Sequence, residues 1–127
     1  MNLNDVKIAG NLVKDPKLQR TPQGTPVANV SLGVNETYTV SDEKRTATTF
    51  VDVQLWGVAA ENFSKLAQKG QQIFIEGALR QDTWVDKQTK QPRSKLFVRA
   101  ERWQFIQYKA TEAQREAARA QPQGMER

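Results

Sequence analysis

The sequence contains no cysteine and no histidine among its 127 residues. These absences exclude disulfide bonds, zinc sites built on either residue, thiol catalysis and any acid–base mechanism that relies on an imidazole. Enzymatic chemistry would therefore need a cluster of carboxylates, but the acidic residues are scattered along the chain. An enzyme is the least favoured class of function, and we expect neither a metal nor a cofactor.

Long apolar runs are missing as well. No stretch approaches the ~20 apolar residues of a membrane helix, and the N-terminal segment MNLNDVKIAG lacks the basic and apolar parts of a signal peptide. We therefore expect a cytoplasmic protein without a membrane partner. The length favours a single domain, and the net charge of +5 permits a nucleic-acid partner without demonstrating one.

The pattern of apolar and polar residues predicts five strands and one helix. The strands are expected at residues 3–13, 27–38, 48–57, 72–80 and 96–106, and the helix at 59–70. A helix between the third and fourth of five strands is the layout of the OB-fold, a small and partly open barrel. We therefore expect an all-β fold with one helix, arranged as a five-stranded OB-fold barrel.

Polar segments mark two hairpin connections and the end of the domain. Residues 39–48 predict a flexible hairpin loop, and residues 82–95 hold the end of one strand, a basic turn and the return. From about Lys109 onward apolar residues are few, which is typical of a flexible segment. The predicted organisation is one domain over residues 1–108 and a flexible tail over residues 109–127.

Four of the ten aromatic side chains lie in polar surroundings. In the stretch TTFVDVQLWG (48–57), strand alternation places Phe50 and Trp56 on the polar face, beside Asp52. Tyr38 precedes the polar loop, and Trp84 stands among polar residues. Five others are expected in the core or in a subunit contact: Phe63, Phe74, Phe97, Trp103 and Phe105.

For any one of the four, capping an edge of the core or filling a protein interface is the simpler interpretation. Together they favour a surface on which unpaired bases stack, because the strands that carry them are expected to be neighbours on one side of the barrel. Basic residues near the loops would attract the phosphates. The candidate cations are Lys44, Arg45, Lys69, Arg80, Lys87, Lys90 and Arg93, with Lys95 beside them.

Several short motifs, in this order and spacing, resemble those of the bacterial single-stranded DNA-binding protein family (SSB). The resemblance covers about residues 3 to 106. It rests on GNL with DPKLQR (10–20), TPQG followed by VANVSL (21–32), LWG with AAE (55–61), KGQQIFIEGALR (69–80) and TW (83–84).

The resemblance implies that Tyr38, Phe50, Trp56 and Trp84 match the family's base-stacking positions. It further implies an OB-fold that assembles as a homotetramer and wraps single-stranded DNA. The expected function is binding with little sequence preference in replication, recombination and repair, in association with the nucleoid.

Two features depart from the family pattern. Asp52, Asp82 and Thr83 occupy positions that are commonly basic in the family. This difference should weaken the attraction of phosphates, so that base stacking contributes a larger share of the DNA-binding affinity. Asp52 is expected to pair with Arg80 or Lys7, or to tune DNA release. The chain also ends in QPQGMER rather than an acidic tip, so recruitment of repair proteins through such a tip is not expected.

Two other functions remain open from the residues. One is a protein-interaction OB-fold, in a replication-restart or secretion complex, whose aromatic surface meets protein. The other is an OB-fold that binds RNA.

Overall fold

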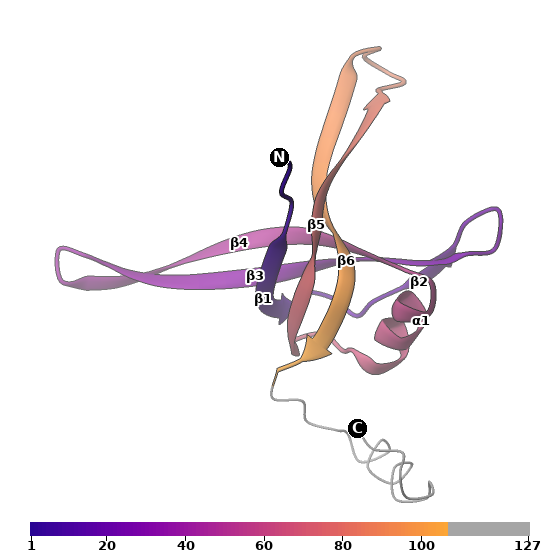
Figure 1. Cartoon of the computed structure of the whole chain (residues 1–127). Coiled ribbons are helices and arrows are strands. Elements are labelled where there is room, and N and C mark those ends of the chain that lie inside the picture. Colours follow the sequence, from indigo (N-terminus) through magenta and orange to yellow (C-terminus); the bar gives the residue numbers. More distant parts are fainter. Residues whose placement is uncertain (107–127) are drawn as a thin grey trace, which may run out of the picture.

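The computed structural model describes residues 1–106, so residues 107–108 of the expected domain and the expected tail at 109–127 lie outside the described part. The described elements follow one another as predicted in type, with one additional short strand (Figure 1). They are β1 (Val6–Leu12), β2 (Leu18–Arg20), β3 (Pro26–Val40), β4 (Glu43–Trp56), α1 (Gly57–Leu66), β5 (Gln72–Val85) and β6 (Pro92–Phe105).

The strands form one sheet that closes on itself. Their order is β1-β5-β6-β4-β3-β2, and a further pairing of β1 with β3 joins the two sides. All pairs are antiparallel except β4 with β6, which run parallel and pair over Val53↔Val98 and Gln54↔Arg99. Five long strands with α1 between the third and fourth form the OB-fold, as predicted, and β2 adds a three-residue strand beside β3.

Alternate residues of the strands fill the barrel. On β4, Val53 and Leu55 are buried while their neighbours Asp52 and Gln54 face away, so the apolar residues line the interior. Phe63 of α1 is fully buried. The predicted core positions Trp103 and Phe105 pack against this cluster, whereas Phe74 and Phe97, which were expected in the core or a subunit contact, are only partly buried and lie outside it.

The aromatic contacts explain how α1 is held. The ring of Phe63 meets Trp103 edge to face at a centroid distance of 5.0 Å, and Trp103 meets Phe105 in the same way at 5.2 Å. Such pairs add stabilisation beyond the burial of their area. The helix is shorter than predicted: it begins at Gly57 and ends at Leu66, because Ala67 already has an extended backbone.

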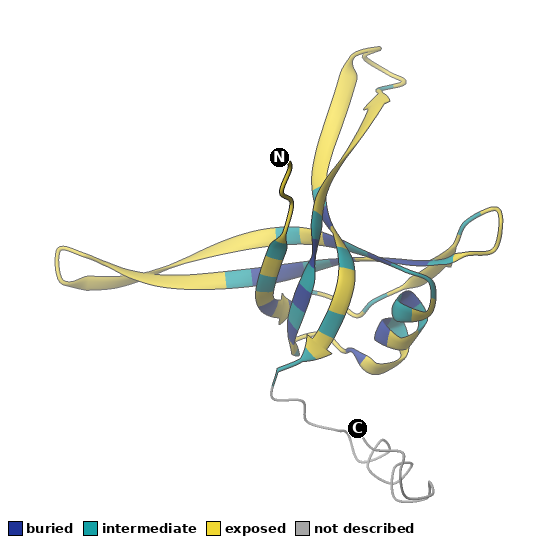
Figure 2. Cartoon of the chain, in the orientation of Figure 1, coloured by how far each residue is buried: buried dark blue, intermediate teal, exposed yellow. Residues whose placement is uncertain are grey.

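The prediction of a flexible loop at residues 39–48 is wrong. β3 and β4 stay paired from Val27↔Trp56 to Val40↔Glu43, and only Ser41 and Asp42 form the turn, with φ angles of 51° and 65°. Two successive positive φ values are the signature of a tight type I′ hairpin turn. Residues 39–48 are mostly polar because this part of the hairpin is exposed on both faces and covers no core (Figure 2).

Two long hairpins therefore project from the barrel as arms (Figure 1). We call residues 35–49 the β3–β4 arm and residues 79–96 the β5–β6 arm; nearly all their residues are exposed (Figure 2). The turn of the second arm, residues 86–91, is where the predicted basic turn lies. The arms extend the sheet surface well beyond the small core.

A close approach between β5 and β6 occurs at Gly77. The pairing of these strands shifts register between Glu76 and Gly77, which marks a β-bulge. A Cβ atom at Gly77 would collide with the backbone carbonyl oxygen of Arg99. Neither backbone can move without disturbing the strand pairing, so this position needs glycine.

We expect Gly77→Ala to lower the free energy of unfolding by about 1–3 kcal/mol, or to prevent folding, because the added methyl group overpacks a backbone contact. Gly33→Ala is the matched control, since its Cβ would meet the Phe50 ring at 3.5 Å and the Thr48 methyl group at 3.7 Å, which are ordinary contact distances. Urea unfolding of both variants measures the difference. Equal unfolding midpoints would show that the close approach imposes no constraint.

Candidate nucleic-acid interface

Strand alternation defines one continuous surface on the outside of the barrel. On β4 the residues that alternate with the buried ones are Phe50, Asp52, Gln54 and Trp56. Gln54 is paired with Arg99 of β6, so the same face continues onto β6 and then onto β5. We call this surface the outer face. Its members on the last two strands are Arg80, Asp82 and Trp84 of β5 and Arg93, Lys95, Phe97 and Arg99 of β6.

Phe50 and Trp84 are the exposed rings of the outer face. Phe50 is 67% exposed and Trp84 is 48% exposed, which is unusual for side chains of this size. The ring of Phe50 lies beside its strand partner Gly33 of β3, where a Cβ atom would stand at an ordinary contact distance of 3.5 Å from the ring. Trp84 lies on the β5–β6 arm, opposite Arg93. Both rings can offer a flat apolar surface to a ligand.

Trp56 is more enclosed and is held by polar partners. Its Nε1 donates a hydrogen bond of 2.6 Å to Oε1 of Gln54. The Arg99 guanidinium lies 5.2 Å from the centroid of its ring, within the range of a cation–π contact. These contacts fix the orientation of the indole at the end of β4.

The structure does not place all four predicted aromatic side chains on one surface. Phe50 pairs with Gly33, whereas Tyr38, five residues further along β3, pairs with Arg45. An odd separation along a strand reverses the side-chain direction, so Tyr38 is on the opposite face of the arm from Phe50. Moreover, β6 lies between β4 and β5, so Trp84 is not on a strand adjacent to Phe50.

The predicted cations fall into three groups. Arg80 and Arg93 belong to the outer face, and Lys87 and Lys90 lie in the turn of the same arm. Lys44 and Arg45 are on a strand of the β3–β4 arm rather than in a loop, as residues 39–48 were expected to be, and the Arg45 guanidinium pairs with Glu43 at 3.3 Å.

Lys69 stands apart from both arms. It is in the turn after α1, where its backbone N–H donates to Asp15 Oδ1 at 2.8 Å. This contact ties the turn to the segment between β1 and β2, so Lys69 lies beside that segment.

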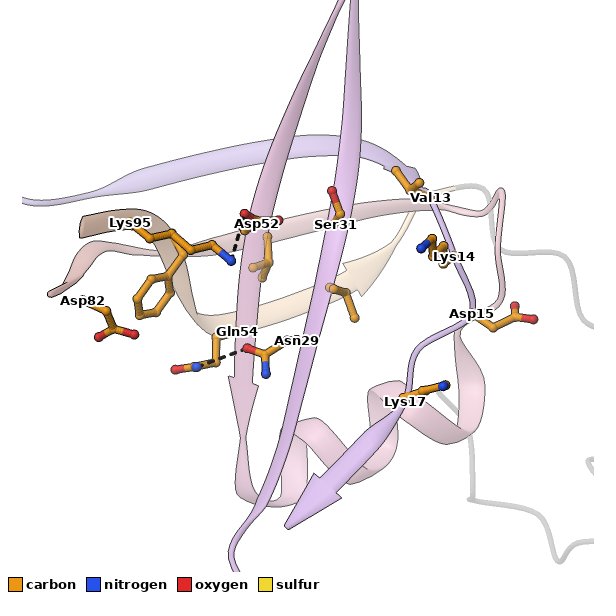
Figure 3. A pocket seen from close by; sticks show the side chains of 13 residues that line it. Val13, Lys14, Asp15, Lys17, Asn29, Ser31, Asp52, Gln54, Asp82 and Lys95 are labelled. Atoms are coloured by element: carbon orange, nitrogen blue, oxygen red, sulfur yellow. Dashed lines mark hydrogen bonds and ion pairs between the residues drawn. The ribbon is translucent and has the colours of Figure 1, made fainter. Parts of the chain in front are cut away.

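A groove of about 550 Å³ crosses the outer face between the two sides of the barrel (Figure 3). Its floor includes Asn29 of β3 with Asp52 and Gln54 of β4. One wall comes from the β5–β6 arm and the other from the segment between β1 and β2 (Figure 3). Its three lysines, at positions 14, 17 and 95, are matched by three aspartates, at 15, 52 and 82, so the groove is formally neutral.

The partner of Asp52 is neither of the two expected residues. Lys95 Nζ lies 3.3 Å from Asp52 Oδ2 and so links β6 to β4. Lys7 is instead paired with Asp5 at 2.7 Å and with Glu76 at 3.5 Å, and the hydrogen bond to Asp5 raises its pKa above the ordinary value. Asp52 is therefore part of a cross-strand pair inside the groove.

Arg99 and the groove were not predicted from the sequence, and Lys95 was expected only near a loop. The signal was present in PRSKLFVRA (92–100), where Arg93, Lys95, Phe97 and Arg99 alternate with Ser94, Leu96 and Val98. That alternation puts the basic and aromatic residues on one face of β6. The groove has no comparable signal, because residues far apart in the sequence form it.

Asp86 organises the turn of the β5–β6 arm. Its carboxylate accepts hydrogen bonds from the backbone N–H groups of Gln88 at 2.8 Å and Thr89 at 3.2 Å, and Arg93 Nε lies 3.4 Å away. The backbone hydrogen bonds, with a smaller contribution from Arg93, hold the pKa of Asp86 below its ordinary value of 3.8. The turn beside Lys87 and Lys90 is therefore shaped by an ionised carboxylate.

A barrel of this kind, with exposed rings and a groove on its outer face, defines an OB-fold with a surface suited to nucleic acid. A model of the Single-strand binding protein family matches residues 3–106. The chain belongs to that family.

Similar proteins include the single-stranded DNA-binding protein of Wolinella succinogenes, which is 36% identical over 107 residues, covering 84% of this chain and 65% of the relative. That of Thermus thermophilus is 45% identical over 83 residues, covering 65% of this chain and 30% of the relative. The chain thus spans between 30% and 65% of the length of these curated relatives.

Solved structures of similar fold include a deletion mutant of the single-stranded DNA binding protein from Thermus aquaticus. Its TM-score is 0.72 at 30% identity, covering 82% of this chain and 50% of that chain. A Plasmodium falciparum SSB complex with ssDNA has a TM-score of 0.73 at 19% identity, covering 84% of this chain and 97% of that chain, and this likeness concerns the fold alone.

Within residues 1–106, no helix has the length and apolar character needed to cross a membrane. The same part of the chain holds no group of three or more acidic side chains placed to bind a metal ion.

We expect Asp86→Ala to shift the amide resonances of Gln88 and Thr89 at neutral pH, because the variant removes the acceptor of both N–H groups. The pKa of Asp86 is lowered in the folded protein, so its contribution to the turn is complete above pH 3.8 and is lost as the pH falls through the lowered pKa. The wild-type resonances should therefore move the same way on acidification. NMR spectra of Asp82→Ala serve as the control, and unchanged turn resonances in Asp86→Ala would contradict the assignment.

Proposed function

We propose that this protein binds single-stranded DNA without strong sequence preference, on the outer face of its barrel. The observation that carries the proposal is the combination of the exposed rings of Phe50 and Trp84 with the groove on the same face. Every base has a π face, so stacking on aromatic rings holds an unpaired strand whatever its sequence, at about 1–3 kcal/mol per base. Duplex DNA keeps its bases stacked and cannot use these rings.

The phosphates would be attracted mainly from the β5–β6 arm. Arg80 and Arg93 lie on the outer face of this arm, and Lys87 and Lys90 lie at its tip. Because the groove itself is formally neutral, the cations surround the base-binding region rather than fill it. This arrangement favours stacking as the main source of affinity, with a modest dependence on salt.

We propose a second contact region on the β3–β4 arm. Tyr38 is 46% exposed, and Lys44 and Arg45 lie on the same arm near its turn. Since Tyr38 is on the opposite face from Phe50, a strand must pass around the arm to reach both rings. Lys69 would add a cation beside the other wall of the groove.

The arms also support the proposal that the chain acts as a homotetramer. Leu79, Val85 and Leu96 on the β5–β6 arm are exposed although they follow the core-facing alternation of their strands. Assembly of several chains would cover these side chains and place several outer faces along one DNA strand. We propose the corresponding role in DNA replication, recombination and repair, in the cytoplasm on the nucleoid, with no catalytic activity and no membrane partner.

We expect Phe50→Ala and Trp84→Ala each to weaken the binding of oligothymidylate by about 1–3 kcal/mol, because each removes one stacking surface. Fluorescence titration measures the affinity, and circular dichroism checks that the variants remain folded. Val58→Ala is the control, since Val58 is an exposed apolar residue of α1 and is not one of the outer-face residues.

Equal affinity of the wild type for duplex and single-stranded DNA would overturn the proposal. Stronger competition by oligouridylate than by oligothymidylate would identify RNA as the preferred ligand instead.

A further inference from the structure

The floor of the groove is built from fixed hydrogen-bonding groups. The Trp56 indole donates to Gln54 Oε1 at 2.6 Å, and Gln54 Nε2 donates to Asn29 Oδ1 at 3.2 Å. These two hydrogen bonds set the direction of both side-chain amides and leave the Asn29 Nδ2 group without a partner among residues 1–106. A ligand over the floor therefore meets ordered polar groups rather than mobile side chains.

Asp52 adds a fixed acceptor beside these amides. Its Oδ2 atom is held by Lys95 at 3.3 Å, yet the side chain is 49% exposed, so the carboxylate remains open to the groove. It stands two residues from Phe50 on the same face of β4, a spacing of about 7 Å along a strand. A base stacked on Phe50 can therefore bring its edge over the Asp52 carboxylate.

The charge of Asp52 decides which part of a nucleotide can occupy the groove. A carboxylate repels a phosphate. An ionised carboxylate can only accept hydrogen bonds, so it favours ligand groups that donate them. The lysines of the groove only balance its aspartates in number, so the groove offers a phosphate no net attraction. The base edge, rather than the backbone, is the part that fits the floor.

We propose that Asp52 makes the groove selective for bases with an exocyclic amino group, so that cytosine is preferred over thymine. Aspartate can accept from the N4 amino group of cytosine. Thymine has no amino group, and its single ring N–H lies between two carbonyl oxygens that repel a carboxylate. The inference rests on the proposed function, since it specifies which bases the proposed DNA site favours.

The test compares the affinities of the full chain for oligocytidylate and oligothymidylate of equal length, at mildly alkaline pH where cytosine is not protonated. We expect the wild type to bind oligocytidylate at least about fivefold more tightly, the lower end of the range for one specific base contact. In Asp52→Ala this ratio should fall to about one. Affinity for oligothymidylate should be unchanged or higher in Asp52→Ala, because Lys95 is released to a phosphate.

Asp82→Ala is the matched control, because it also removes one aspartate from the groove. Asp82 lies on β5 in the groove wall, opposite Lys95 of β6. The control should change both affinities by a similar factor and keep the ratio. Equal binding of the two oligonucleotides by the wild type, a preference that survives Asp52→Ala, or an equal loss of preference in Asp82→Ala would each overturn the inference while leaving the proposed function intact. Failure to bind either oligonucleotide would overturn both.

Discussion

The burial of alternate residues on the barrel strands fixes which side chains face outward, and the candidate site depends on this. Val53 and Leu55 of β4 and Val98 of β6 are buried in one core, so the register of these two strands is set by packing. A shift of one residue would turn the core residues to solvent and the aromatic residues inward. The same burial that stabilises the barrel therefore also presents Phe50 and Trp56 on the outer face.

The two arms extend the outer face beyond the barrel, but nearly all of their residues are exposed to solvent. Beyond the barrel the two hairpins keep the strand pairing but have no core of their own, so their stability comes from cross-strand contacts and from their tight turns. Ser41 and Asp42 shape one turn through positive φ angles, and Asp86 shapes the other through its backbone hydrogen bonds. Exposed rings such as Trp84 are available to a ligand because no part of residues 1–106 covers them fully.

Local alternation in the sequence was enough to predict the OB-fold and to separate Trp103 from Phe50 and Trp56. It could not predict the length of the arms, because a ribbon that is polar on both faces has the composition of a loop. It also could not show that Tyr38 faces away from Phe50, since this depends on the register between β3 and β4. The Asp52–Lys95 pair joins residues that no local pattern relates, so only the folded chain shows how the charge of Asp52 is accommodated.

The proposed position of single-stranded DNA on the outer face can be tested in one experiment with the three tryptophans. Trp56 and Trp84 belong to the outer face, whereas Trp103 packs against the core. Oligothymidylate is titrated into nitrogen-15-labelled protein, and the three indole N–H resonances are followed by NMR. If the DNA lies on the outer face, the Trp56 and Trp84 signals will shift while the Trp103 signal stays in place. A shift of Trp103 alone, or no shift of any indole on saturation, would contradict it.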